Sequence, residues 1–392
     1  MGQQVLKLGG KVIEIQSLES SPSQLFSIST NASLPAVLKL SKAYLVWEKE
    51  IPAGFAHYLL LNSMRDHISC LPKGVDYTVL ADDYAYLGEG DVIRLSKDKK
   101  SIRTLYRASS ANNSILVTEQ CNHYCLMCSQ PPKNVDDSWI LEEIGNLIPL
   151  IPKTAREIGF TGGEPTLFGE LFLDILRLTK SYLPFTAIHI LSNGRRFKDA
   201  AFTRSYAGID HPDMMVGIPI YSDDPAIHDY IVQASGAFDE TIQGVLNLKR
   251  FNQKVEIRVV LHQQSIKRLK PLCEFLARNL LFVDHVALMG LEMMGFTRAN
   301  LDKLWIDPYE YRDILSEAVG ILASYGMNVS VYNHQLCLVK QDVQPYYRKS
   351  ISDWKNEYAP ECTGCARMSE CGGFFSSGIQ HRYSDHLEPF LG

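Results

Sequence analysis

The sequence predicts an α/β protein in which a β-rich N-terminal segment precedes a parallel sheet flanked by helices. From Ser114 to Asp307, short apolar runs alternate six times with longer stretches in which apolar residues recur every three or four positions. Residues 1–110 instead show short apolar runs separated by turn residues, which indicates a small β-rich domain with one helix. Repeated strand–helix units form either an open barrel or a doubly wound sheet.

Length and composition are those of an ordinary folded protein. The 392 residues suffice for two or three domains, and 46% are hydrophobic while 21% are charged. A net charge of −5 argues against a nucleic-acid partner, which needs a concentrated basic surface. We find no apolar run of membrane-spanning length and no signal-peptide core, so we expect a cytoplasmic protein with no membrane partner. Its nine cysteines are then metal ligands rather than disulfides.

The N-terminal segment contains five expected strands: Val12–Ile15, Ala43–Val46, Tyr77–Leu80, Gly90–Leu95 and Ile102–Tyr106. The basic stretch Lys97–Arg103 is interpreted as a solvated hairpin turn. His57, His67 and Cys70 lack the spacing of a ligand set, so we interpret them as structural.

The central segment contains six expected strands: Ile115–Val117, Ile158–Thr161, Ile188–Ser192, Met215–Ile220, Val255–Leu261 and Val286–Gly290. The expected helices between them are Ser138–Ile148, Leu167–Ser181, Ala200–Ala207, Phe238–Phe251 and Ile266–Leu281. In such folds the chemistry collects at the carboxyl ends of the strands. Polar residues that follow these strands are therefore the candidate site.

Three cysteines with the spacing Cys-x3-Cys-x2-Cys follow the first of these strands, namely Cys121, Cys125 and Cys128. Thiolates select zinc or iron–sulfur clusters. A structural zinc site needs four ligands, so the zinc alternative requires His123 or a distant residue. A four-iron cluster held by three cysteines keeps one iron open for chemistry, so the odd number indicates a reactive site.

This motif after a strand resembles the signature of the radical S-adenosylmethionine (radical SAM) enzymes. The resemblance implies a partial (β/α)6 barrel and a [4Fe-4S] cluster whose open iron binds SAM, with reductive cleavage of SAM to a 5'-deoxyadenosyl radical. Many members carry an aromatic residue just before the third cysteine, where this chain has Met127. The three ligands themselves are intact.

The same resemblance implies a set of SAM contacts at other strand ends. Gly162, Gly163 and Glu164 belong to a Gly-Gly-Glu-Pro segment after the second strand, which in isolation is an ordinary turn but here matches the family's motif for the SAM amino group. Ser192 and Asn193 follow the third strand, where an Asn-Gly turn is the alternative, and Arg258 lies on the fifth. His228 is expected to be a surface histidine with its hydrogen bonds satisfied, and the Met-rich stretch 287–295 and Cys273 are expected in the core. No spacing identifies a catalytic acid or base.

The tail holds a second group of cysteines, with Cys337 upstream of a Cys-x2-Cys-x5-Cys run formed by Cys362, Cys365 and Cys371. Four cysteines in a short stretch indicate a bound metal, with a closed four-thiolate zinc site as one alternative. The arrangement resembles the SPASM or twitch-like auxiliary-cluster segments of radical SAM enzymes that act on peptides. That resemblance implies a second [4Fe-4S] cluster.

The stretches Val117–Cys121 and Cys128–Lys133, with Gly90-Asp-Val, Arg107 and the tail motif, resemble the radical SAM maturases of the His-Xaa-Ser system. The resemblance implies a small-protein substrate with His-Xaa-Ser repeats, a second radical SAM protein as partner and an electron donor. The expected domains are 1–110 (β-rich), 111–307 (radical SAM core) and 308–392 (auxiliary cluster). Two alternatives stay open: a radical SAM enzyme acting on a nucleotide or other small molecule, and a non-catalytic zinc-binding module.

Overall fold

The computed structural model describes residues 7–16, 24–96, 100–349 and 356–391. The chain forms two compact units. One comprises Met1–Ile115, Glu142–Ile158 and Leu178–Thr186, and the other comprises Leu116–Leu141, Gly159–Arg177 and Ala187–Gly392.

The N-terminal segment folds into an eight-stranded sheet with the order β1-β8-β7-β3-β4-β5-β6-β2. Its strands are β1 (Gly9–Lys11), β2 (Glu14–Gln16), β3 (Leu25–Ser29), β4 (Lys42–Leu45), β5 (His57–Leu61), β6 (Tyr77–Leu80), β7 (Val92–Leu95) and β8 (Ser101–Tyr106), with helix α1 (Ala36–Lys39) and 3-10 helices η1 (Asn62–Cys70) and η2 (Asp82–Tyr84) between them. The central strands β3 to β6 pair in parallel and the outer pairs are antiparallel.

Both faces of this sheet are buried, because neighbouring residues of one strand belong to different cores. On β4, Ala43 and Leu45 lie in one apolar cluster while Tyr44 lies in the other. The prediction of a β-rich segment is confirmed, as is the antiparallel hairpin of β7 and β8, although its turn residues 97–99 lie outside the described residues. The sequence prediction missed β1, β3 and β5. Strand β3 was hidden because its core positions include the buried serines Ser27 and Ser29.

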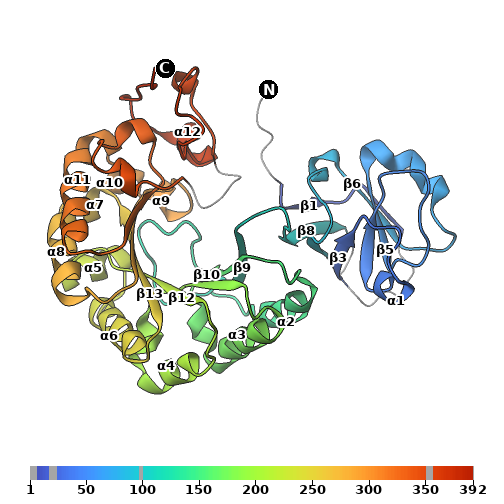
Figure 1. Cartoon of the computed structure of the whole chain (residues 1–392), viewed down its shortest axis with the longest axis horizontal. Helices are drawn as coiled ribbons and strands as arrows, with labels where there is room; N and C mark the ends of the chain where they lie inside the picture. The colour runs from blue at the N-terminus through green and yellow to red at the C-terminus, as the bar shows by residue number, and fades with distance from the viewer. Residues whose placement is uncertain (1–6, 17–23, 97–99, 350–355, 392) are drawn as a thin grey trace. The chain divides into compact units, whose positions relative to one another are not determined.

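The second sheet has seven strands in the order β15-β14-β13-β12-β11-β10-β9. They are β9 (Asn113–Thr118), β10 (Glu157–Gly162), β11 (Ala187–Leu191), β12 (Met214–Pro219), β13 (Lys254–Leu261), β14 (His285–Gly290) and β15 (Val329–Tyr332). The pairs from β11 to β15 are parallel. A doubly wound sheet requires the strand order to reverse, and here it never does. The sheet is therefore an open, partial barrel, as Figure 1 shows.

Helices follow the strands, and those between β11 and β14 lie along the outer side of this sheet in Figure 1. The helices after the first sheet are α2 (Trp139–Leu147), α3 (Glu170–Tyr182), α4 (Ala200–Ala207), α5 (Pro225–Val232), α6 (Ala237–Arg250), α7 (Gln263–Ile266), α8 (Leu269–Asn279), α9 (Phe296–Ala299), α10 (Leu301–Leu304), α11 (Pro308–Ser324) and α12 (Ser376–His381). The 3-10 helices are η3 (Ile148–Leu150), η4 (Pro165–Phe168), η5 (Arg195–Lys198), η6 (Leu336–Leu338), η7 (Gln344–Tyr346) and η8 (Pro360–Cys362). The six predicted strands are confirmed, and β15 extends the sheet beyond them.

Strand β13 shows how the two faces of the barrel sheet differ. Val255, Ile257 and Val259 are fully buried on one face, whereas Glu256 and Arg258 alternate with them and lie on the other. Cys273 on α8 is fully buried, which confirms its expected place in the core. The inner face therefore holds ionisable side chains among apolar walls.

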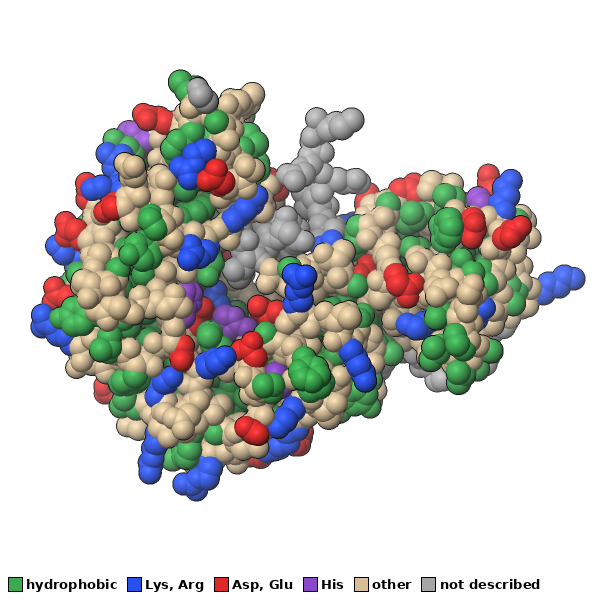
Figure 2. All heavy atoms as spheres, viewed as in Figure 1, with side chains coloured by type: hydrophobic (Ala, Val, Ile, Leu, Met, Phe, Trp, Pro, Cys, Tyr) green, Lys and Arg blue, Asp and Glu red, His purple; other side chains and the backbone are tan. Residues whose placement is uncertain are grey.

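None of the helices in the described ranges is long and apolar enough to cross a membrane. On the face drawn in Figure 2, Lys and Arg side chains are interspersed with Asp and Glu side chains rather than gathered into one field.

Candidate functional site

The loop after β9 contains Cys121, Cys125 and Cys128, each partly exposed. Burial, with smaller contributions from the charges of Glu164 and Cys128, raises the pKa of Cys121 to about 12. Burial likewise raises the pKa of Cys125, with contributions from Cys128 and Cys121. The three thiols are thus electrostatic neighbours, and loading a metal onto them would release protons.

Asp137, which the sequence interpretation missed, holds the start of this loop. Its carboxylate is 3% exposed and accepts hydrogen bonds from the Thr118 hydroxyl at 3.0 Å, the Glu119 backbone N–H at 2.5 Å and the Gln120 side-chain amide at 3.1 Å. Glu119 also pairs with Lys133 at 2.6 Å. Asp137 therefore fixes the direction in which the chain leaves the strand.

A second set of contacts holds the end of the loop. Three donors bind consecutive carbonyl groups of residues 126–128: the Asn300 amide to Leu126 at 2.9 Å, the Thr297 hydroxyl to Met127 at 3.1 Å and the Phe296 backbone N–H to Cys128 at 2.8 Å. Gly295 has a φ of 54°, and a Cβ there would lie 2.3 Å from the Cys128 carbonyl oxygen. The start of α9 therefore packs directly on the third cysteine.

The paired glycines after β10 are required by the cysteine loop itself. A Cβ on Gly163 would lie 1.9 Å from the carbonyl oxygen of Gln120, and one on Gly162 would lie 2.3 Å from that of Thr118. The backbone N–H groups of Gly163 and Glu164 donate to these same two carbonyls at 2.8 Å each. Glycine is thus needed because two backbones meet without space for side chains.

Glu164 joins two of the predicted SAM contacts. One carboxylate oxygen, Oε1, accepts from the Thr166 backbone N–H and hydroxyl at 3.0 and 2.5 Å and from the Ser192 hydroxyl at 2.8 Å. The other, Oε2, accepts from the Asn193 backbone N–H at 2.6 Å. The Asn193 amide in turn donates to the Asn122 side chain at 2.6 Å. Glu164, Ser192 and Asn193 therefore form one buried network that reaches the cysteine loop.

Arg258 lies apart from this network on the inner face of β13. Its Nε is 3.6 Å from Glu256 Oε1 and its Nη2 donates to the Met289 sulfur at 3.2 Å. Burial would raise the pKa of Glu256, but hydrogen bonds from His189 and His285 and the charge of Arg258 hold that pKa well below its ordinary value. Arg258 is thus partly neutralised by a carboxylate that stays ionised.

Buried histidines lie near the cysteine loop. His228 is 1% exposed, so the expectation of a surface histidine is wrong: its Nδ1 accepts from the Tyr221 backbone N–H at 3.3 Å, and its Nε2 has no partner among the described residues. Burial lowers the pKa of His228 to about 4. Burial and the charge of Arg195 lower the pKa of His123 to about 3. Both rings are neutral near pH 7, which keeps positive charge from building up beside the thiols.

The four tail cysteines lie around one small cavity, which is lined by Cys337, Cys362, Cys365 and Cys371. The backbone N–H groups of Leu336 and Gly373 donate to the Cys371 sulfur at 3.3 and 3.4 Å. Burial raises the pKa of Cys362, as do the charges of Cys371 and Cys365. The fold therefore brings Cys337 to the other three across a gap in the sequence.

Both cysteine sets fit an iron–sulfur cluster or zinc by donor chemistry, since thiols dominate them and amide groups donate to sulfur. Within the described ranges, no three His, Cys, Asp or Glu side chains stand in the arrangement of a formed metal site. The thiols are neighbours whose side chains would have to turn toward a common centre on loading.

Residues 115–276 match the family model described as the Radical SAM superfamily. None of the curated proteins matches the chain in sequence. The narrower His-Xaa-Ser resemblance therefore stays a prediction.

Solved structures share parts of the fold. The structure of anSMEcpe with bound AdoMet and the Cp18Cys peptide has a TM-score of 0.50 at 14% identity, over 70% of this chain and 92% of that one. Streptococcus suis SuiB bound to S-adenosylmethionine has a TM-score of 0.46 at 16% identity, over 57% of this chain and 50% of that one. The chain thus spans about half the length of the SuiB structure.

Proposed function

We propose that this protein is a radical SAM enzyme that modifies a peptide or small protein. The observation that supports it most directly is the three-thiol loop at the carboxyl end of the first strand of the segment that matches the radical SAM family model. In this proposal Cys121, Cys125 and Cys128 hold a [4Fe-4S] cluster that leaves one iron open. When bound, the cluster and SAM would supply a 5'-deoxyadenosyl radical for hydrogen abstraction.

The chain's own residues would bind and orient SAM. Oε1 of Glu164 accepts three hydrogen bonds, whereas Oε2 accepts one and keeps a lone pair for an ammonium donor. The adjacent glycines, Gly162 and Gly163, allow close approach to the loop, and Ser192 and Asn193 offer polar groups to a ribose. Arg258 offers a cation to a carboxylate on the inner face. These roles follow the family resemblance and agree with the buried network around Glu164.

We assign the tail cysteines to a second [4Fe-4S] cluster, with zinc as the alternative. A cluster at this place would anchor the substrate or accept an electron from its radical. The substrate class we propose is a small protein with His-Xaa-Ser repeats. We propose that the enzyme works in the cytoplasm with a second radical SAM protein and an electron donor. We also propose that the domains are those expected from sequence, at 1–110, 111–307 and 308–392. The anSMEcpe structure contains a bound peptide, and this chain shares its fold.

Cysteine variants test the division of roles between the two sets. The measurement is 5'-deoxyadenosine formed from SAM and dithionite by reconstituted protein under anaerobic conditions. Cys125→Ala should abolish the product, whereas Cys362→Ala should retain cleavage that is not coupled to substrate. Cys70→Ala is the matched control, because Cys70 is exposed on η1 and lies outside both sets. Equal and complete loss in Cys125→Ala and Cys362→Ala would contradict two separate sites.

A further inference from the structure

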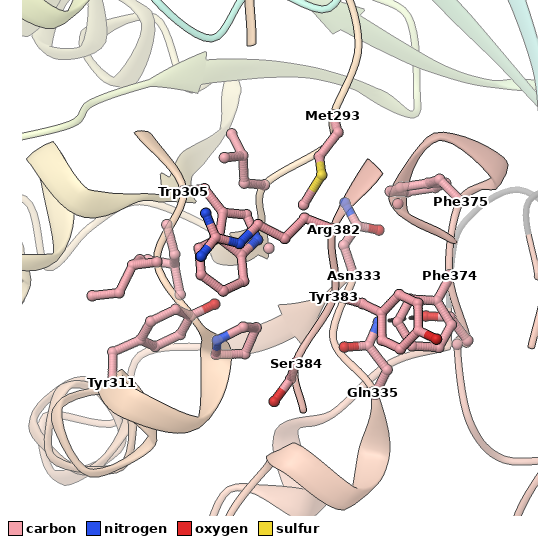
Figure 3. A pocket seen from close by; sticks show the side chains of 18 residues that line it. Met293, Trp305, Tyr311, Asn333, Gln335, Phe374, Phe375, Arg382, Tyr383 and Ser384 are labelled. Atoms are coloured by element: carbon pink, nitrogen blue, oxygen red, sulfur yellow. Dashed lines mark hydrogen bonds between the residues drawn. The ribbon is translucent and has the colours of Figure 1, made fainter. Parts of the chain in front are cut away.

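A second cavity opens at the carboxyl ends of β13, β14 and β15 (Figure 3). Leu261 and Gly290 are the last residues of β13 and β14, and Asn333 follows the last residue of β15. Five of its 18 lining residues are aromatic and come from the loop before α11, from α11 and from the tail: Trp305, Tyr311, Phe374, Phe375 and Tyr383. In parallel barrels this edge of the sheet is where ligands bind.

Two polar groups at this cavity have neither an ion pair nor a side-chain hydrogen bond within the described ranges. Arg382 is exposed, and its guanidinium carbon lies 3.8 Å from the centre of the Trp305 ring, yet within the described residues it forms no ion pair and donates no side-chain hydrogen bond. The Asn333 amide likewise has no side-chain hydrogen bond in the described part of the chain. The other amide at the cavity, Gln335, already donates to the Gly373 carbonyl at 2.9 Å.

The wall of the cavity is continuous in sequence with segments next to both cysteine sets. Its wall residues Leu291 and Met293 begin the loop that ends at Gly295, which packs on the Cys128 carbonyl. On the other side, Gly372 and Gly373 directly follow Cys371. The cavity wall therefore shares short chain segments with both cysteine sets. The expectation that the Met-rich stretch is core holds for Met289 and Met293, which are buried, while Met294 is 41% exposed.

We propose that this cavity binds a side-chain carboxylate of the substrate peptide, with Arg382 as the charged partner and Asn333 as a second donor. The proposal deepens the proposed function and depends on it for the substrate class. A guanidinium presents parallel N–H groups that match a carboxylate, and an aromatic ring beneath it holds its plane. The site selects acidic peptides over neutral isosteres.

The test compares blocked, fluorescein-labelled peptides of three His-Glu-Ser repeats and of three His-Gln-Ser repeats, both amidated at the C-terminus. Dissociation constants are measured by anisotropy on reconstituted protein with SAM. We expect the Glu peptide to bind about tenfold more tightly than the Gln peptide, as for a charge-assisted hydrogen bond. Arg382→Gln should reduce this ratio to about one, and Arg382→Lys should leave an intermediate ratio because it keeps the charge without the fork. A Gln peptide with a free C-terminus should bind like its amidated form, since the side chain is the proposed source.

Arg278→Gln is the matched control, because Arg278 on α8 has 67% of its side chain exposed and lies outside the cavity. It should keep the full preference for the Glu peptide. Equal binding of the two peptides, an unchanged ratio in Arg382→Gln, tighter binding through the free C-terminus, or no binding of either peptide would each overturn the proposal. SAM cleavage by the unaltered protein without peptide is measured separately, so loss of the proposed function is distinguishable from loss of this subsite.

Discussion

Replacing Gly163 by alanine tests whether the Gly-Gly-Glu segment and the cysteine loop are one structural unit. The added Cβ would lie 1.9 Å from the Gln120 carbonyl oxygen, 2.5 Å from its carbon and 3.1 Å from the Cys121 Cβ. These are backbone atoms or sit on the backbone, so no flexible side chain can move aside. Either the loop shifts or the segment does. The shift would weaken the two hydrogen bonds donated by Gly163 and Glu164 at 2.8 Å.

The expected loss in the free energy of unfolding of Gly163→Ala follows from these contacts. Overpacking contributes about 1–3 kcal/mol and the two weakened hydrogen bonds about 1 kcal/mol each, so the free energy of unfolding should fall by roughly 3–5 kcal/mol. At about 2–4 °C per kcal/mol, the melting temperature should fall by roughly 6–20 °C. The assay is circular dichroism of the metal-free protein, followed by iron retained after reconstitution, which should also fall.

Gly320→Ala is the matched control, since a Cβ at this position in α11 meets nothing within 4 Å. Alanine in a helix interior should keep or slightly raise the melting temperature. A melting temperature and iron content for Gly163→Ala equal to those of the unaltered protein would refute the packing described for this segment.

Three further predictions concern residues around the site. Asp137→Asn should lower the free energy of unfolding by about 2 kcal/mol in urea titrations and reduce the iron bound after reconstitution, because an amide cannot accept from all three donors. Asp313→Asn is the control at an exposed aspartate and should change neither quantity. His262→Asn should reduce the loss of stability on acidification. Burial lowers the pKa of His262 to about 3, so below about pH 6.5 this histidine is protonated in the unfolded chain but stays neutral in the folded chain. The difference lowers the free energy of unfolding by about 2 kcal/mol at pH 5. Asparagine keeps the cap on α7, and an unchanged acid slope would contradict this. Gly217→Val should weaken SAM binding in calorimetry, because a Cβ there already approaches Arg258 Cδ to 3.1 Å, and unaltered affinity would argue against a role for Arg258.

The barrel was largely predictable because its strands are continuous apolar runs and its helices repeat every three or four residues. The alternation of strands and helices by itself allowed either an open barrel or a doubly wound sheet. The choice of a partial barrel came from the family resemblance, and the strand order confirms it. The order β9 to β15 never reverses, and only pairing between distant strands reveals this. A helix that contains His228 was expected without bounds, and α5 runs over the eight residues Pro225–Val232 before Gln233 adopts a left-handed conformation.

The candidate site was predictable where a motif fixed residue types and spacing, as for Cys121 and the tail cysteines. The residues that hold the cysteine loop in place were not predictable. Gly295 and Asn300 lie far along the chain from the loop they hold, and Asp137 lies in the irregular segment before α2. No local pattern marks any of the three as a contact to the loop. The surface interpretation of His228 failed because the rings that bury it, Tyr221 and Phe238, come from neighbouring elements that a local pattern does not reveal.

The central claim is that two cysteine sets hold iron–sulfur clusters, one of which cleaves SAM. The most direct test is iron, sulfide and zinc content on anaerobically reconstituted protein, followed by 5'-deoxyadenosine formation with SAM and reductant. We predict about eight irons and about eight sulfides per chain, as for two four-iron clusters, together with 5'-deoxyadenosine. Zinc without sulfide, and no 5'-deoxyadenosine, would contradict the account and leave a zinc-binding protein.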